Sequence, residues 1–242
     1  MRFRRKKSEL PVPKQEASRS ISWIRIGLAA LVALGAVAGF LSWPKRKVCP
    51  DTCRIGRQLI LQQTLSRFED PIIVLGDSIV EASTLPRSLC GHAIVNAGLG
   101  GASTGSDLGG WLSGALGQKR AGLIVVSLGT NDAMGSQSQQ AFETRYSALL
   151  TQLSVLTTHL VVMAVPPLEA GGHVAIAARD RAMDLINGYN AVLPGLAKNG
   201  GALFVALPPM SDPHTIDGIH LDTAGYAVWD AAVLKGAASI CS

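Results

Sequence analysis

The sequence predicts an α/β protein: a three-layer α/β/α sandwich with a five-stranded parallel sheet, preceded by one N-terminal transmembrane helix. Five short apolar runs alternate with segments of helical spacing, which is the pattern of a parallel sheet covered on both faces. The chain has 242 residues, of which 48% are hydrophobic, enough for one sizeable core. An uncharged segment near the N-terminus predicts the membrane helix.

The elements of the sandwich follow one another in a regular order. We expect strands rich in β-branched and other apolar residues at 71–76, 92–98, 122–129, 159–167 and 202–209. Apolar residues at helical spacing predict helices at 57–68, 106–118, 140–156, 176–198 and 222–238. Asn199-Gly200 is a typical C-cap signal for the fourth of these helices.

The N-terminal segment 26–43 runs for 18 residues without a charge. As a helix it would span about 27 Å, close to the hydrocarbon core of a bilayer. Trp23 and Trp43 lie near its ends, and the basic residues before it outweigh those after it, so the positive-inside rule places the rest of the chain outside the cytoplasm, on the periplasmic side. We divide the chain into a basic cytoplasmic leader (1–25), an anchor or signal segment (26–43), a juxtamembrane linker and helix (44–69) and a globular domain (70–242).

Signal cleavage is the alternative to an anchor. Ala36-Val37-Ala38 has the small-x-small pattern of a cleavage site, and cleavage there would give a secreted protein. However, the apolar residues continue past this point to Trp43, and the basic region is long for a signal peptide. These two features favour an uncleaved anchor.

The positive charge of the chain belongs to its leader. Residues 1–47 carry 11 Lys and Arg against 2 acids, a net charge of +9, whereas residues 48–242 carry 11 against 15, a net charge of −4. We therefore expect no nucleic-acid partner. Cys49-Pro-Asp-Thr-Cys53 resembles half of a metal site, but no second Cys/His pair at suitable spacing completes it, so we expect no metal.

Reactive side chains follow several of the predicted strands. The segments concerned are Gly76-Asp77-Ser78, Asn96 to Gly101, Gly129-Thr130-Asn131-Asp132 and, after the last strand, Asp217-Gly218-Ile219-His220. Because the carboxyl ends of parallel strands meet at one edge of the sheet, we expect these segments to converge there. A hydroxyl, a carboxylate–imidazole pair, a glycine backbone and a carboxamide are the groups that acyl transfer requires.

These four segments, in this order and spacing, resemble the SGNH/GDSL hydrolase family of esterases and lipases, which have a flavodoxin-like sheet. The resemblance covers about residues 71–225. The four letters GDSL in the family name stand for Gly-Asp-Ser-Leu, and this chain differs from them only at Ile79, which stands in place of Leu. It implies that Ser78 is the nucleophile, His220 the general base and Asp217 the residue that orients the imidazole.

The same resemblance implies an oxyanion hole formed by the backbone N–H groups of Ser78 and Gly101 and by the side-chain amide of Asn131. Elementary chemistry agrees, because glycine lets the backbone approach a substrate oxygen and a carboxamide donates a hydrogen bond at any pH. We expect Asp77 to be structural, Asp132 to support the loop of Asn131, and Asn96 to support that of Gly101.

Other interpretations remain open. His214 also follows an acid, Asp212, but lacks the family spacing of the base. The Gly-rich stretch Gly98-x-Gly100-x-x-Ser103 faintly resembles a dinucleotide-binding turn without its third glycine or its acid, so we expect no cofactor. A non-catalytic binding module would keep the fold without needing the reactive residues.

The predicted function is that of a membrane-anchored extracytoplasmic serine esterase acting on short-chain acyl esters of small molecules or carbohydrates. The alternative is an O-acyltransferase or O-deacetylase that acts on cell-envelope carbohydrate with the same site. The segments that flank the motifs contain few aromatic residues and no large lid, which favours short acyl groups.

The flavodoxin-like fold also bears on the cysteines. In it, the helix after the first strand and the last helix cover one face and both run toward the amino edge of the strands. Cys90 follows the first of these helices and Cys241 the second, so we predict a Cys90–Cys241 disulfide. Cys49 and Cys53 would then pair locally or remain free.

Overall fold

The computed structural model describes residues 51–169 and 176–241. The predicted leader and membrane segment, at 1–25 and 26–43, lie outside these ranges. Among the described residues, no helix combines the length and the apolar character that crossing a membrane requires. The predicted anchor is therefore not tested by the structure.

The sheet contains all five predicted parallel strands and one that was not predicted. Its order is β2-β3-β1-β4-β5-β6, and β2 is antiparallel to β3. The strands are β1 Ile72–Gly76, β2 Ser88–Leu89, β3 His92–Gly98, β4 Leu123–Ser127, β5 Leu160–Met163 and β6 Leu203–Val205. The expectation of five strands was thus one too few, because a two-residue edge strand is too short to produce an alternating or apolar pattern.

The helices agree with the sequence in order but differ at two places. They are α2 Asp51–Leu65, α3 Ser78–Ala82, α4 Leu108–Leu116, α5 Thr130–Met134, α6 Gln139–Ser154, α7 Ile176–Asn199 and α8 Thr223–Ala237, with a final 3₁₀ turn at Ala238–Ile240. Helix α2 begins within the expected linker, six residues before position 57. The resemblance implied the helix after the first strand, which is α3, but periodicity did not give its bounds, and α5 was not predicted, because five residues cannot show helical periodicity.

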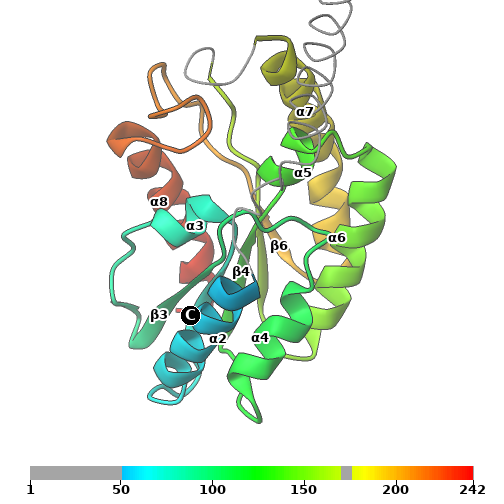
Figure 1. Ribbon diagram of the computed structural model, residues 1–242. Helices are drawn as coiled ribbons and strands as arrows, with labels where there is room; N and C mark the ends of the chain where they lie inside the picture. The colour runs from blue at the N-terminus through cyan, green and yellow to red at the C-terminus, as the bar shows by residue number, and fades with distance from the viewer. Residues whose placement is uncertain (1–50, 170–175, 242) are drawn as a thin grey trace, which may run out of the picture. The chain divides into compact units, whose positions relative to one another are not determined.

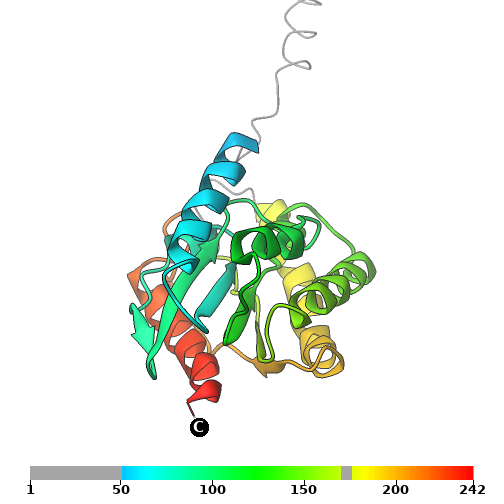
Figure 2. The ribbon, with the colours of Figure 1, turned by 90° about the horizontal axis from the view of Figure 1, so that it is seen from below.

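The strands send alternate side chains into two separate cores. Ile73 and Leu75 of β1 pack with α2, α4, α6 and α7 on one face, whereas Ile72 and Val74 pack with α3 and α8 on the other. Figures 1 and 2 show this arrangement, with α8 on the opposite side of the sheet from α4, α6 and α7. The three-layer sandwich is therefore as predicted.

The predicted disulfide between Cys90 and Cys241 is confirmed, and the cysteines of the described residues include none that is free. Cys90 lies beyond α3 as expected, in the turn between β2 and β3, and Cys241 follows the last 3₁₀ turn. The bridge joins the edge of the sheet to the end of α8, on the face that α3 and α8 share.

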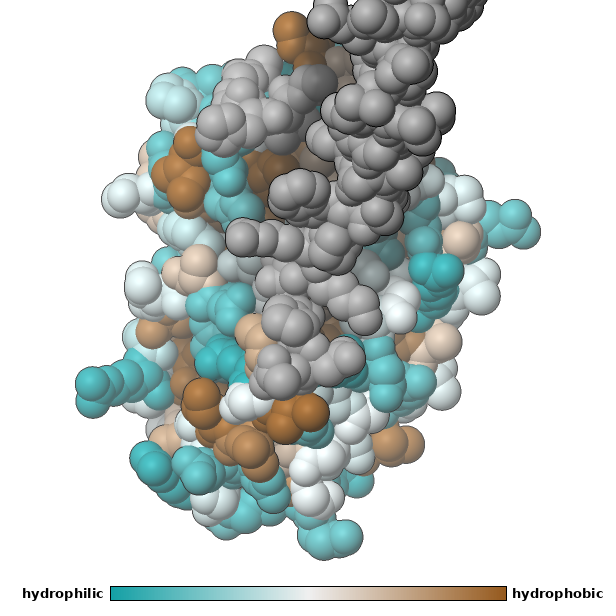
Figure 3. Space-filling view, viewed as in Figure 1, coloured by the Kyte–Doolittle hydropathy of each residue, from teal (hydrophilic) through white to brown (hydrophobic). Residues whose placement is uncertain are grey.

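The surface visible in Figure 3 is mainly hydrophilic, with separate apolar patches. Large exposed apolar side chains are distributed over several elements, and three of them, Ile55, Leu59 and Ile60, lie on α2.

Candidate active site

The polar segments begin side by side at the carboxyl edge of the sheet. Gly76, the last residue of β1, is level with Gly98 of β3 on one side and with Ser127 of β4 on the other. The strand order reverses at β1, because β3 follows it in the chain on one side and β4 on the other. Ligands of open α/β sheets bind at such a reversal, so the topology brings the predicted motifs to the expected place (Figure 1).

Ser78 lies at the sharp turn that joins β1 to α3. Asp77 is the N-cap of α3, and its carboxylate accepts a 2.9 Å hydrogen bond from the backbone N–H of Ile79. A Cβ on Gly76 would lie 2.3 Å from the carbonyl oxygen of Ser127, and one on Gly98 would lie 2.1 Å from the backbone nitrogen of Glu81. Glycine is therefore required at both strand ends for α3 to pack directly on the sheet.

The side chains of Ser78, His220 and Asp217 form a continuous hydrogen-bonded chain. The Ser78 Oγ lies 3.0 Å from Nε2 of His220, and Nδ1 of His220 lies 2.7 Å from Oδ2 of Asp217. A carboxylate at Nδ1 holds the proton there and leaves the lone pair of Nε2 facing the hydroxyl. This arrangement can move the serine proton to the imidazole as the oxygen attacks an electrophile.

Asp217 is held by its own turn. Its Oδ1 accepts hydrogen bonds from the backbone N–H of Ile219, at 3.0 Å, and of His220, at 2.8 Å. Partial burial tends to raise the pKa of Asp217, but the hydrogen bonds from His220 and Ile219 outweigh it, so the pKa is lowered below the ordinary value. The Asp217 carboxyl group is therefore ionised near neutral pH.

Glu169, which follows β5, fixes the loop that bears Asp217 and His220. Its carboxylate accepts hydrogen bonds from the backbone N–H of His214, at 2.7 Å, and of Thr215, at 2.9 Å, and from the hydroxyl of Thr215. Its own N–H donates to the carbonyl of Gly218 at 3.0 Å. A buried carboxylate with several donors is well satisfied and forms a rigid anchor for the loop.

Gly101 lies on the loop after β3, and Asn131 lies on α5, in contact with that loop. Gly101 has φ of +76°, a conformation that favours glycine. The amide nitrogen of Asn131, on α5, donates a 2.9 Å hydrogen bond to the carbonyl of Ala102, the residue after Gly101. Ser78 is the first residue after the N-cap of α3, so its N–H points out of the helix without an intrahelical acceptor.

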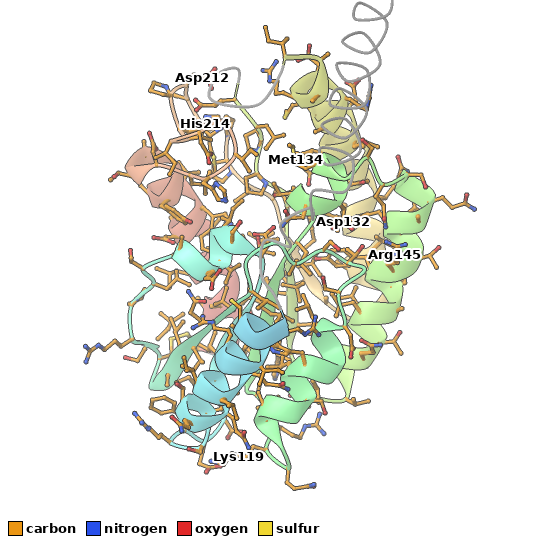
Figure 4. The ribbon with its side chains drawn as sticks, in the orientation of Figure 1. Lys119, Asp132, Met134, Arg145, Asp212 and His214 are labelled. Atoms are coloured by element: carbon orange, nitrogen blue, oxygen red, sulfur yellow. A yellow bond between two sulfur atoms is a disulfide. The ribbon has the colours of Figure 1, made fainter. Side chains whose placement is uncertain are left out.

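Asp132 links α5, which carries Asn131, to the segment that follows Gly101. Its carboxylate accepts hydrogen bonds from the backbone N–H, at 3.1 Å, and from the hydroxyl of Thr104, which follows the Gly101 loop. Figure 4 shows Asp132 at the base of α5, in the interior of the domain. The expected supporting role of Asp132 is confirmed, and it extends to the Gly101 loop.

Asn96 and Arg57 hold the end of β3. The Asn96 Oδ1 accepts from the N–H of Gly98 at 2.9 Å, and its Nδ2 donates to the carbonyl of Val80 in α3 at 2.6 Å. Arg57 of α2 donates to the carbonyls of Asn96 and Gly98, at 3.0 and 3.1 Å. Asn96 thus fixes the end of β3, from which the Gly101 loop starts, rather than contacting Gly101 itself, and α2 takes part in the same support.

Two buried carboxyl groups under the site have raised pKa values. Burial raises the pKa of Asp77 to about 7, against the opposing effects of the Ile79 hydrogen bond and of the nearby His220. Burial also raises the pKa of Asp132, although the Thr104 hydrogen bonds act in the other direction. The negative charge of Asp132 raises the pKa of Asp77 further.

The structure thus brings together Ser78, Asp217 and His220, and it brings Gly101 together with Asn131. It directs His214 elsewhere, because the His214 ring is buried against Glu169 and the carbonyl of Pro167. Glu169, Thr215 and Arg57 were not predicted as parts of the site. Each lies outside the motifs, and a single acid, hydroxyl or base at such a position gives no periodic or spacing signal.

Comparisons with known proteins identify the family of the chain. The model of the GDSL-like lipase/acylhydrolase family matches residues 74–228, which include every residue of the predicted triad. No curated protein sequence matches the chain.

Among solved structures, a Streptococcus pneumonia protein assigned as platelet activating factor aligns with a TM-score of 0.61 at 23% identity, over 76% of this chain and 94% of that one. A Bacteroides fragilis protein assigned as an acylhydrolase aligns with a TM-score of 0.58 at 16% identity, over 75% and 95%. The acetylxylan esterase Axe2 of Geobacillus stearothermophilus aligns with a TM-score of 0.54 at 16% identity, over 69% and 93%. At these identities the likeness concerns the fold.

Proposed function

The chain belongs to the GDSL-like lipase/acylhydrolase family and is an SGNH-type ester hydrolase, and we propose that it hydrolyses short-chain acyl esters through Ser78, His220 and Asp217. The observation that supports this triad most directly is the unbroken chain of contacts from the Ser78 hydroxyl through His220 to Asp217, at 3.0 and 2.7 Å. Serine acyl transfer requires a hydroxyl nucleophile, an imidazole base and a carboxylate that orients the base, each within hydrogen-bonding distance of the next.

In the proposed reaction the Ser78 oxygen attacks the ester carbonyl while Nε2 of His220 takes the hydroxyl proton. Asp217 stabilises the imidazolium that forms. When the tetrahedral intermediate collapses, His220 gives the proton to the leaving alcohol and the acyl group remains on Ser78. Water then attacks this acyl-enzyme with His220 again as base, which releases the carboxylic acid and restores the serine.

The negative charge of the tetrahedral intermediate would be stabilised by three donors: the N–H groups of Ser78 and Gly101 and the amide of Asn131. Support for Gly101 comes from its positive φ and its exposure, and support for Asn131 from its contact with the adjacent Ala102. Such preorganised donors commonly contribute the largest single part of the rate acceleration.

For the substrate, we propose an acetyl or similarly short ester, on a small molecule or a carbohydrate. The triad is accessible, since the side chains of His220 and Asp217 are 38% and 33% exposed, which suits a bulky alcohol moiety outside the site. One structural neighbour acts on acetylated xylan, by its name. We also propose that residues 26–43 anchor the enzyme in the membrane with the catalytic domain on the periplasmic side, supported by the uncharged run and its basic flank.

An ester panel on the purified full-length protein tests this function. We expect turnover of acetate and butyrate esters of nitrophenol, a decline with longer acyl chains, and none with the Ser78→Ala protein. Adding oligosaccharide acceptors separates hydrolysis from transfer, because a transferase would produce acylated sugar in place of free acid. Undiminished turnover of long-chain esters would contradict the proposed substrate class.

A further inference from the structure

Three side chains of types that can bind metal ions meet beside the loop that bears Asp217 and His220. They are Glu169, which follows β5, and Asp212 and His214, which precede α8. Nδ1 of His214 lies 3.1 Å from Oε1 of Glu169 and 3.1 Å from Oδ1 of Asp212. Asp212 is largely exposed, whereas His214 and Glu169 are buried. Figure 4 shows Asp212 and His214 close together on this loop.

The His214 ring has one nitrogen with an acceptor and one without a hydrogen-bond partner. Its Nε2 faces the carbonyl oxygen of Pro167 at 3.4 Å, so Nε2 is the nitrogen placed to carry the ring proton. Its Nδ1 is buried, in a residue only 3% exposed, and makes no hydrogen bond, although two carboxylate oxygens lie 3.1 Å away. Neither oxygen therefore lies where a proton on Nδ1 would point.

This geometry differs from that of an ordinary His–carboxylate hydrogen bond, in which the acceptor lies along the N–H direction. In a metal site the other ligand atoms flank the lone pair instead of lying on it. With metal–ligand bonds of about 2.1 Å, a separation of 3.1 Å corresponds to an angle of about 95° at the metal, between octahedral and tetrahedral values.

We propose that Glu169, Asp212 and His214 form a binding site for a divalent cation of the zinc class. One imidazole nitrogen and two carboxylate oxygens suit zinc better than magnesium or calcium, which prefer oxygen ligands alone. The surroundings also resemble those of ligating residues. Glu169 is oriented by the backbone N–H groups of His214 and Thr215, and His214 by the Pro167 carbonyl.

A cation in this site would join the segment after β5 to the loop that leads to His220. The exposed Asp212 would form the entrance, and water would complete the coordination. The role is one of support, because none of the three ligands contacts Ser78, Asp217 or His220 through a hydrogen bond or ion pair among the described residues.

Zinc binding to the full-length protein tests the proposal. After treatment with a chelator and dialysis, titration calorimetry and elemental analysis with Zn²⁺ should give one zinc ion per chain and a raised thermal midpoint. Asp212→Asn, which alters an exposed side chain and should leave folding intact, should weaken binding at least tenfold and remove the thermal shift.

Two further variants identify the site. His220→Ala removes the proposed catalytic imidazole and should bind zinc as the wild type does, which makes the result independent of the proposed function. His159→Gln changes an exposed histidine and should also have no effect. Failure of the wild type to bind zinc would overturn the proposal and leave the cluster as an ion pair, as would unaltered binding by Asp212→Asn.

Discussion

The hydroxyl oxygen of Ser78 lies 3.0 Å from Nε2 of His220, although 142 positions separate the two residues in the chain. Each partner is fixed by a different part of the fold. Ser78 is fixed by the short helix α3 against two glycines, and His220 by a loop that Glu169 ties to the end of β5. The proposed chemistry therefore depends on residues that never touch a substrate.

Asp77 should make the stability of the protein fall as pH rises. Its pKa is raised to about 7 in the folded state, whereas the unfolded chain ionises near the ordinary value, so the unfolded state binds fewer protons between these values and stability declines across that window. The side chain of the Asp77→Asn variant keeps an oxygen that can cap α3, but it does not titrate. When the pH rises from about 5 to about 8, the free energy of unfolding of the wild type, measured with urea, should fall by about 2 kcal/mol relative to that of this variant.

Asp107→Asn provides the matched control for that measurement, because Asp107 caps α4 at an exposed position. It measures what the same Asp-to-Asn change costs at a helix cap that is exposed. A difference between wild type and Asp77→Asn that does not change with pH would contradict the raised pKa of Asp77.

Asn131→Ala should lower kcat by about 100- to 1,000-fold and leave KM nearly unchanged, because an oxyanion donor acts mainly in the transition state. The loss corresponds to about 2.7–4 kcal/mol. Steady-state kinetics with a short-chain ester measures it, and Asn199→Ala at the exposed end of α7 is the control. An unchanged kcat would remove Asn131 from the oxyanion hole.

Glu169→Gln should lower kcat more than it raises KM, since it loosens the loop that positions His220 without touching the substrate. Unfolding free energy should fall by about 1–3 kcal/mol, the range for hydrogen bonds to a buried charged group. Glu69→Gln removes a surface carboxylate that is 85% exposed and paired with Lys119, and should cost less than about 1 kcal/mol. Equal effects of the two variants would show that Glu169 has no special part in the loop.

The double variant Cys90→Ser/Cys241→Ser should lose about 2–5 kcal/mol of stability, because the bridge closes a loop across a separation of 151 residues. Its kcat well below the unfolding temperature should match that of the wild type, since the bridge does not contact the triad. Urea unfolding and ester kinetics measure the two quantities. Non-reducing peptide mapping in which both cysteines are alkylated before reduction would contradict the pairing.

The strands and the long helices could be predicted because each has a repeated pattern over many residues. The convergence of Ser78 with His220 could be anticipated because parallel strands end at one edge, and the pairing of Cys90 with Cys241 because α3 and α8 share a face. The antiparallel β2 could not be predicted, since two residues have no pattern.

The support of the site was harder to predict than its reacting groups. Glu169 is a single acid after an apolar strand, and only the folded loop brings the N–H groups of His214 and Thr215 to it. Arg57 was likewise assigned to a helix without any indication that it would reach the end of β3. Contacts of this kind depend on tertiary approach, which local sequence patterns do not encode.

The most direct test of the proposed triad is covalent labelling of the full-length protein with a serine-directed phosphonate, followed by peptide mass spectrometry and ester turnover. We expect a single adduct on Ser78, loss of both labelling and turnover in Ser78→Ala and near-complete loss in His220→Ala, with folding retained by circular dichroism. Unchanged ester turnover by the folded Ser78→Ala protein, or an adduct on another residue, would contradict it.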